Sequence, residues 1–290
     1  YVGKPPELGT GVFAMDTGSS SAVIPQYDSN FPVDFALARQ PSTSETWYTC
    51  ARLTQGKYLS TDSTAAESSS SIFPFDSNVG WAKNHGTNYQ SWMWKRHAGF
   101  DVVTYGPGTD TTLDVAHSLG KTPEMIWVKR REQSVDWNVY HSALASNKRL
   151  RLNLSNSEQG SVAFPNAPTS SHFTVQKVAD EGVNDSDGDF IALLFANVDG
   201  ISKVGSYTGN GTSGHAITGL GFAPRFLIVK AASTTSSWSV FDTTRGWASG
   251  NDKQLALNSN AAEVTSYDYA DPTSTGFTIN ITGNAMNGSG

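Results

Sequence analysis

The sequence predicts an all-β protein made of three tandem units, each a β-sandwich of the jelly-roll type. Three observations predict it. A pattern of residues recurs about every hundred positions, and apolar residues within it alternate with a period near two. Only 16% of the residues are charged, while glycine contributes 27 of the 290 residues. This composition suits short strands joined by polar turns better than helices, which favour Ala, Leu, Glu, Lys and Arg.

Two copies of the recurring pattern are easily aligned. Residues 118–129 read SLGKTPEMIWVK and residues 219–230 read GLGFAPRFLIVK. Both place Leu-Gly, two further residues and Pro ahead of an apolar run that ends in Lys. Trp137 and Trp238 each follow that lysine by eight positions, and Tyr105 aligns with Tyr207. The pattern predicts units over residues 100–201 and 202–290.

A more divergent copy occupies residues 1–99. Its Phe31–Arg39 segment takes the place of the Pro-led strand, and Trp47 again follows by eight positions. Residues 89–95, YQSWMWK, match residues 190–196, FIALLFA, as the strand that closes each unit. After residues 284–290 the third copy has no such strand. We expect the parent polypeptide to continue beyond residue 290, with a strand supplied by another chain as the alternative, because an unpaired edge promotes aggregation.

The apolar patterns within a unit define its strands in order. The continuous run Met125–Val128 predicts a strand buried on both faces. Asp136–Tyr140, Arg149–Leu154 and Phe173–Gln176 alternate apolar and polar residues, so each is expected to bury one face. No stretch of about 12 residues carries a helical period. Because strand faces fill the core, binding specificity is expected in the loops.

The tryptophans divide into two groups. Trp47, Trp137 and Trp238 recur at one position of the pattern, which predicts a core role in each unit. Trp81 and Trp247 lie in expected loops beside glycine and polar residues. They are the candidates for exposed rings that stack on a ligand, with core packing as the alternative.

One acidic stretch has the spacing of calcium ligands. Residues 184–189 read NDSDGD, with Asp185, Asp187 and Asp189 at alternate positions and a turn-forming glycine between them. The twelve-residue loop with a terminal Glu is absent. An acidic turn ahead of the closing strand is therefore the simpler interpretation. No cofactor is expected, and calcium is kept as the alternative.

No other motif predicts catalysis. Residues 16–19 read DTGS, as in aspartic proteases, but that chemistry needs a second such motif and none is present. We interpret the string as a turn. The six histidines lack metal-binding spacing, and no nucleophile motif occurs. The chain is therefore predicted not to be an enzyme. A carbohydrate-active enzyme stays open as an alternative, because its two carboxylates come from distant strands.

Charge and apolar content exclude further classes. The net charge is -6 and the pI about 5.5. The densest basic run, Lys129-Arg130-Arg131, is interpreted as a solvated strand end, so nucleic acid is not an expected partner. Cys50 is the single cysteine, which leaves no intrachain disulfide. No apolar run approaches the roughly 18 residues of a membrane span.

Four strings of the sequence resemble a repeat family of marine and cyanobacterial phages: residues 92–105, 118–129, 136–141 and 206–211. Units of this family recur in tail-fibre-like and other virion proteins, and their role is uncharacterised. The resemblance implies a protein of the virion surface, assembled in the host cytoplasm, that binds a host receptor or polysaccharide and contacts other virion proteins. A trimer is implied by analogy with fibres. The alternative is a decoration or connector of the capsid or tail. The resemblance carries no catalytic residues.

Overall fold

The computed structural model describes residues 8–19, 25–108, 110–178, 182–283 and 285–289. These residues form antiparallel strands and two short 3-10 helices, η1 (Gly9–Gly11) and η2 (Arg52–Thr54), with no α-helix among them. The all-β prediction is confirmed. Within the part of the chain described, no helix has the length and apolar character needed to cross a membrane.

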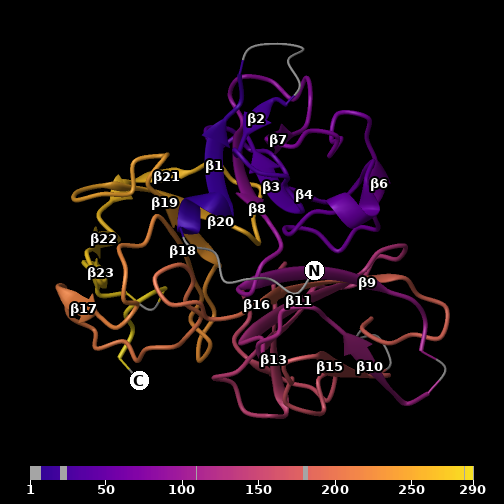
Figure 1. The fold of residues 1–290 in the computed structure, drawn as a ribbon. Coiled ribbons are helices and arrows are strands. Elements are labelled where there is room, and N and C mark those ends of the chain that lie inside the picture. The colour runs from indigo at the N-terminus through magenta and orange to yellow at the C-terminus, as the bar shows by residue number, and fades with distance from the viewer. Residues whose placement is uncertain (1–7, 20–24, 109, 179–181, 284, 290) are drawn as a thin grey trace.

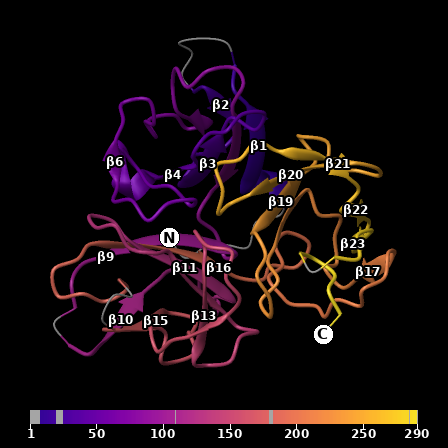
Figure 2. The ribbon, with the colours of Figure 1, turned by 180° about the vertical axis from the view of Figure 1, so that it is seen from behind.

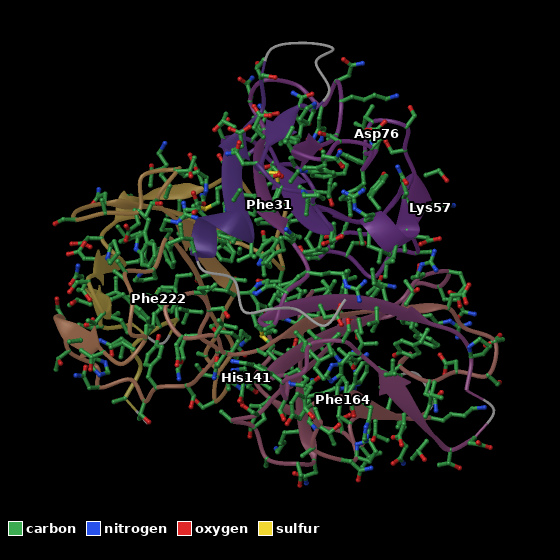
Figure 3. The ribbon with its side chains drawn as sticks, viewed as in Figure 1. Phe31, Lys57, Asp76, His141, Phe164 and Phe222 are labelled. Atoms are coloured by element: carbon green, nitrogen blue, oxygen red, sulfur yellow. The ribbon has the colours of Figure 1, made fainter. Side chains whose placement is uncertain are left out.

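Every sheet is built within one of three consecutive stretches, which we call lobes 1, 2 and 3 and which span residues 13–94, 100–195 and 215–279. The lobes lie side by side around a common centre (Figures 1 and 2). Each lobe has an inner sheet that faces this centre; lobes 2 and 3 add one smaller outer sheet each, and lobe 1 adds two two-stranded sheets. The side chains drawn in Figure 3 fill the space between the two layers, with Phe31 inside lobe 1 and Phe164 inside lobe 2.

The inner sheet of lobe 1 has the strand order β1 (Phe13–Thr17), β8 (Gln90–Trp94), β3 (Phe35–Arg39) and β4 (Tyr48–Ala51). Two short antiparallel pairs of strands complete the lobe. One joins β2 (Tyr27–Asp28) to β7 (Gly80–Trp81), and the other joins β5 (Lys57–Tyr58) to β6 (Ser68–Ser69).

The inner sheet of lobe 2 has six strands. Their order is β14 (Gln159–Gly160), β13 (Lys148–Arg151), β12 (Asn138–His141), β11 (Met125–Arg130), β16 (Phe190–Phe195) and β9 (Phe100–Tyr105). The outer sheet pairs β10 (Thr112–Ala116) with β15 (His172–Gln176). The strand expected over residues 173–176 is therefore present, and the one expected over 149–154 ends early, at Arg151.

The inner sheet of lobe 3 has the order β18 (Phe226–Val229), β19 (Ser239–Asp242), β20 (Asp252–Ala256) and β21 (Val264–Tyr267). Its outer sheet has the order β17 (His215–Ile217), β23 (Gly276–Ile279) and β22 (Ala270–Thr273). Strand β18 lies at one end of the inner sheet.

Central strands of the inner sheets, such as β3, β8, β11 and β16, are almost wholly buried because a core lies on each side of them. In β11, Trp127 faces a central core shared by all three lobes, whereas Ile126 and Val128 face the core of lobe 2. This arrangement confirms the prediction for residues 125–128. The central core joins side chains from every inner sheet, including Leu37, Trp92, Leu193, Val240 and Leu255. Burial of such apolar surface is the main force that holds the lobes together.

The three recurrent tryptophans connect neighbouring lobes within the central core. All three are buried, and each indole N–H donates to a backbone carbonyl of another lobe. Trp47 donates to Ala256 at 2.8 Å, and Trp137 donates to Ser60 at 2.9 Å. Trp238 donates to Arg151 at 2.9 Å. Lobe 1 thus bonds to lobe 3, lobe 3 to lobe 2 and lobe 2 to lobe 1, which closes a ring of contacts.

A second ring of backbone hydrogen bonds runs in the opposite sense. The Glu67 amide donates to Arg131 at 2.6 Å, and the Glu158 amide donates to Ala232 at 2.7 Å. The Glu263 amide donates to Pro41 at 2.8 Å. Each acceptor lies two residues after the basic residue that ends an expected apolar run, namely Arg39, Lys129 or Lys230.

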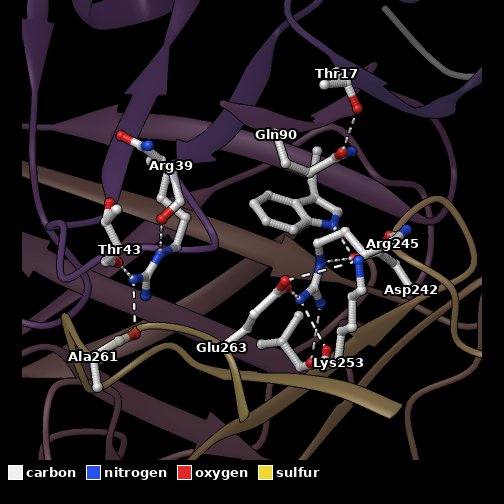
Figure 4. Close-up of polar contacts among 12 residues, drawn as sticks. Thr17, Arg39, Thr43, Gln90, Asp242, Arg245, Lys253, Ala261 and Glu263 are labelled. Carbon is white, nitrogen blue, oxygen red and sulfur yellow. Dashed lines mark hydrogen bonds and ion pairs between the residues drawn. The ribbon is translucent and has the colours of Figure 1, made fainter. Parts of the chain in front are cut away.

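Two buried arginines strengthen the boundary between lobes 1 and 3 (Figure 4). The Arg39 guanidinium donates to the carbonyls of Ser259, Asn260 and Ala261 at 2.8–3.2 Å. Across the same boundary, the Trp92 indole N–H donates to Asp242 Oδ2 at 3.0 Å, and Arg245 Nε donates to the same oxygen at 2.6 Å. These groups are covered by the lobes, so their hydrogen bonds serve packing.

Candidate functional site

An open groove lies on lobe 3, lined by Tyr267, Tyr269, Asn280, Ile281, Thr282 and Gly283. Its walls come from the end of β21, the turn into β22 and the segment that follows β23. All four residues of β21 are exposed, because β21 ends the inner sheet and pairs on one side with β20. The register between β20 and β21 shifts between Asp252 and Gln254. Such an irregularity redirects a strand and its side chains, and is common next to functional sites.

The two tyrosines present an aromatic surface to this groove. The Tyr267 side chain is 57% exposed. Tyr269 is half-buried, with its ring centroid 5.5 Å from that of Phe241 in the core of lobe 3. The tyrosine rings lie 5.7 Å apart with an interplanar angle of 67°. One ring is therefore fixed against the core, and the other extends into solvent, where it is free to contact a ligand.

Directional polar groups lie beside the rings. Asn280 Nδ2 donates to Asp268 Oδ1 at 2.7 Å, and the Asn280 amide N–H donates to the Tyr269 carbonyl at 2.9 Å. These bonds fix the segment that carries Ile281 and the exposed Thr282. Hydroxyl and amide groups held in this way can exchange hydrogen bonds with the hydroxyls of a ligand.

A buried carboxylate holds the tyrosine turn from below. Asp252 Oδ2 accepts the amide N–H groups of Tyr269 at 2.7 Å and of Ala270 at 2.9 Å. Burial raises the pKa of Asp252 to about 6, and the nearby charges of Asp268 and Asp271 act in the same direction. Asp252 therefore positions the wall of the groove through the backbone.

The expectation that Trp81 and Trp247 are exposed stacking rings is wrong. Trp81 is fully buried, with its ring centroid 5.1 Å from that of Phe75, and its Nε1 donates to Ser91 Oγ at 2.9 Å. Trp247 is 2% exposed, and its Nε1 donates to the Ala270 carbonyl at 2.5 Å. Both rings fold back into the cores of their lobes because each finds apolar cover there and a partner for its N–H group.

The acidic stretch closes on an arginine. Arg130 is buried, and its guanidinium donates to Asp185 Oδ2 at 2.8 Å and to Asp187 Oδ1 at 3.1 Å. The Asp189 amide donates to Glu132, whose carboxylate also accepts from Arg130. No group of three or more His, Cys, Asp or Glu suited to a metal occurs among the described residues. Two of the three carboxylates considered for calcium, those of Asp185 and Asp187, thus compensate a buried cation, as an acidic turn beside an arginine would.

Two further interpretations are corrected. The run Lys129-Arg130-Arg131 is not solvated, because Lys129 is fully buried and Arg130 is 4% exposed. Lys129 Nζ donates to the carbonyls of Arg130 and Gln133, and burial lowers the pKa of Lys129 to about 8. The DTGS string is not a turn at its start, since Asp16 lies in β1 and accepts the Asp28 amide N–H at 2.9 Å.

The groove was missed by the sequence reasoning, although one signal was present. Residues 267–269 read YDY, an alternation that places both rings on one side of an extended chain. A Gly-, Pro- and Thr-rich turn follows, and no long apolar run is near enough to cover the rings.

In comparison with known proteins, no curated protein and no solved structure matches the chain. One protein family matches residues 17–290, which is nearly the whole chain, and is described as a domain of unknown function. The chain belongs to this family, DUF7483.

Proposed function

We propose that the protein is a glycan-binding module of a bacteriophage virion surface, of the tail-fibre or receptor-binding type, and that its ligand site is the tyrosine groove of lobe 3. The observation that carries the proposal is Tyr267, whose ring is 57% exposed at the groove. Among the described residues, Tyr267 is the one Trp, Tyr or Phe classed as exposed, whereas Trp47, Trp81 and Trp137 are completely buried.

The chemistry of the groove favours a neutral or hydroxyl-rich ligand. Exposed tyrosine combines a flat apolar ring with a polar tip, and this suits the apolar face and the hydroxyls of a sugar. Asp268 and Asp271 lie next to the rings, and the whole chain carries a net charge of -6. Negative charge at this position disfavours the phosphates of nucleic acid. A host polysaccharide therefore fits better than a nucleic acid.

The proposal includes three repeat units over residues 1–99, 100–201 and 202–290, joined in one body. The two rings of hydrogen bonds support it. Trp47, Trp137 and Trp238 align in the sequence, and each donates to a neighbouring lobe. Copies of one unit around a common centre account for such a closed set of like contacts more simply than three unrelated segments do.

The phage context rests on the resemblance of the sequence strings, and the groove suggests which virion role to test. A decoration or connector protein needs only contacts with other virion proteins. An open aromatic groove, lined by residues of lobe 3 alone, is a feature expected of an adhesin. This difference favours host binding over a purely structural role.

The test is binding of the chain to surface polysaccharides purified from candidate host bacteria, measured by calorimetry. Tyr267→Ala is expected to weaken binding by roughly tenfold, equivalent to about 1.4 kcal/mol. Val264→Ala is the matched control, because Val264 is exposed on the same strand and does not line the groove. Equal binding by both variants would refute the groove as the ligand site. Release of polysaccharide fragments would instead support a carbohydrate-active enzyme.

A further inference from the structure

Strands β3, β11 and β18 occupy corresponding positions in the three lobes, and of these three β18 alone has a described neighbour on a single side. In lobe 1, β3 lies between β4 and β8, and in lobe 2, β11 lies between β12 and β16. In lobe 3, β18 pairs with β19, and the described residues place no strand on its other side. Lobes 1 and 2 therefore show what covers the equivalent edge: one antiparallel strand.

Among the described residues, none forms a backbone hydrogen bond with the free edge of β18. The Thr243 amide donates to the Arg225 carbonyl at 3.0 Å, which makes Arg225 a hydrogen-bonded partner of the neighbouring strand. Because bonding directions alternate along an antiparallel strand, Phe226 and Ile228 direct their N–H and C=O groups to the opposite side. In β11 the residues at the corresponding positions, Met125 and Trp127, face β16. The backbone groups at the free edge of β18 therefore have the orientation needed to pair with an antiparallel strand, as β11 pairs with β16.

The side chains along this edge are also incompletely covered. Phe226 and Ile228 pack against the central core, and Leu227 packs against the core of lobe 3, yet all three are only partly buried. The residues of β11 from Ile126 to Arg130 are buried throughout, as are those of β3. An apolar strand with partly exposed residues on both faces lacks a neighbour that would cover them.

Residues 202–207 of lobe 3 correspond to β9 of lobe 2, and their tyrosine makes a similar hydrogen bond. Tyr105 Oη donates to the Val183 carbonyl at 2.8 Å, and Tyr207 Oη donates to the Met286 carbonyl at 2.7 Å. In lobe 2, β16 lies between β9, which ends at Tyr105, and β11. In lobe 3, residues 202–207 are exposed or partly exposed and form no ladder. By analogy with lobe 2, the position between the Tyr207 segment and β18 corresponds to the one that β16 fills between β9 and β11.

We infer that the edge of β18 is an acceptor site for one added antiparallel β-strand that is apolar on both faces. The strands β8 and β16 define its chemistry. In β16, Ile191 and Leu193 face the central core, and Ala192 and Leu194 face the core of lobe 2. In β8, Trp92 faces the centre and Met93 faces the core of lobe 1. Addition of a strand to an exposed edge gives affinity through backbone hydrogen bonds and specificity through alternate side chains.

The experiment uses a synthetic peptide with the sequence of residues 189–196, DFIALLFA, carrying a lysine tag for solubility, and the chain of residues 1–290. Amide hydrogen exchange of Phe226 and Ile228 is measured with and without peptide. The peptide is expected to slow their exchange by roughly tenfold or more, as ladder bonds do. The control peptide replaces the residue corresponding to Leu193 by Pro, which removes a donor and breaks the ladder. The control is expected to give no protection.

Two results would overturn the inference. One is unchanged exchange at Phe226 and Ile228 at peptide concentrations up to saturation of solubility. The other is a dimer of the chain, formed without peptide, in which these two amides are already protected, because the edge would then pair with itself. A fusion of the same strand after residue 290 through a short Gly-Ser spacer is expected to raise the melting temperature and to abolish binding of free peptide. Continued peptide binding by the fusion would count against the site.

Discussion

The indole N–H of Trp47 donates a hydrogen bond of 2.8 Å to the carbonyl of Ala256, a residue 209 positions further along the chain. The bond connects lobe 1 to lobe 3 inside the central core. Trp137 and Trp238 make the corresponding bonds at the other two boundaries. A buried tryptophan thus bonds across each of the three lobe boundaries, and each lobe supplies the acceptor for a tryptophan of another lobe.

Replacing any of these tryptophans by phenylalanine is expected to destabilise the whole chain. Trp47→Phe leaves the Ala256 carbonyl buried without its donor and removes ring volume, which together cost about 2–4 kcal/mol in the free energy of unfolding. Trp137→Phe and Trp238→Phe are expected to cost similar amounts. Urea denaturation monitored by circular dichroism measures the losses. Tyr267→Phe is the control, with little change because Tyr267 is exposed.

Local patterns were enough to predict the fold class and the recurrent core tryptophans. An apolar run such as Met125–Val128 has few ways to hide both faces, so its position between two cores follows from its composition. Whether a loop residue is buried or exposed cannot be predicted from local composition in this way. Trp81 and Trp247 have neighbours like those of exposed loops, yet both fold into a core, because the space available depends on the sheets around them.

The charged residues show the same limit. The pattern predicts that Lys129 is the polar end of a strand, but that end lies at the boundary with lobe 1, where the Glu67 amide bonds to Arg131. The Lys129 side chain is buried there with carbonyl partners from its own lobe. Tyr267 shows the reverse case, an aromatic ring that the packing of lobe 3 leaves exposed. The exposure of both residues is decided by the tertiary packing around them, which the local sequence pattern does not encode.

Protonation of Asp252 is expected to make the protein more stable. Burial raises its pKa from 3.8 to about 6, so the folded state binds this proton more tightly than the unfolded state does. The contribution of this group to stability is therefore greatest below pH 4 and declines as the pH rises through 6. Asp252→Asn keeps an oxygen for the amides of Tyr269 and Ala270 and carries no charge. The variant is expected to melt above the unmodified chain at pH 8, with a difference that shrinks towards pH 4. A pH-independent difference would show that this charge is not the cause.

Acid is expected to weaken lobe 1 through His85. Burial lowers the pKa of His85 from 6.5 to about 4, and the Tyr27 hydroxyl lies 2.8 Å from its Nδ1 among aromatic rings. A neutral histidine is favoured in the folded state. The contribution of neutral His85 to the stability of the folded state is complete above pH 6.5 and is lost as the pH falls through 4. His85→Phe is expected to reduce the fall in melting temperature between pH 7 and pH 5, measured by calorimetry. His172→Phe is the control, because His172 lies on the lobe surface with its ring partly exposed.

The pairing of Arg130 with the acidic turn predicts unequal effects of its two aspartates. The Asp185 side chain is 22% exposed and that of Asp187 is 75% exposed, while that of Arg130 is 5% exposed. Removing the more buried partner leaves the guanidinium less compensated, so Asp185→Asn is expected to cost about 1–3 kcal/mol in the free energy of unfolding. Asp187→Asn is expected to cost less than about 1 kcal/mol, because water already screens that pair.

Because both carboxylates are engaged with Arg130, millimolar calcium is expected to leave the melting temperature unchanged. A rise with calcium that disappears in Asp187→Asn would restore the calcium interpretation and contradict the arginine as the main partner of this turn.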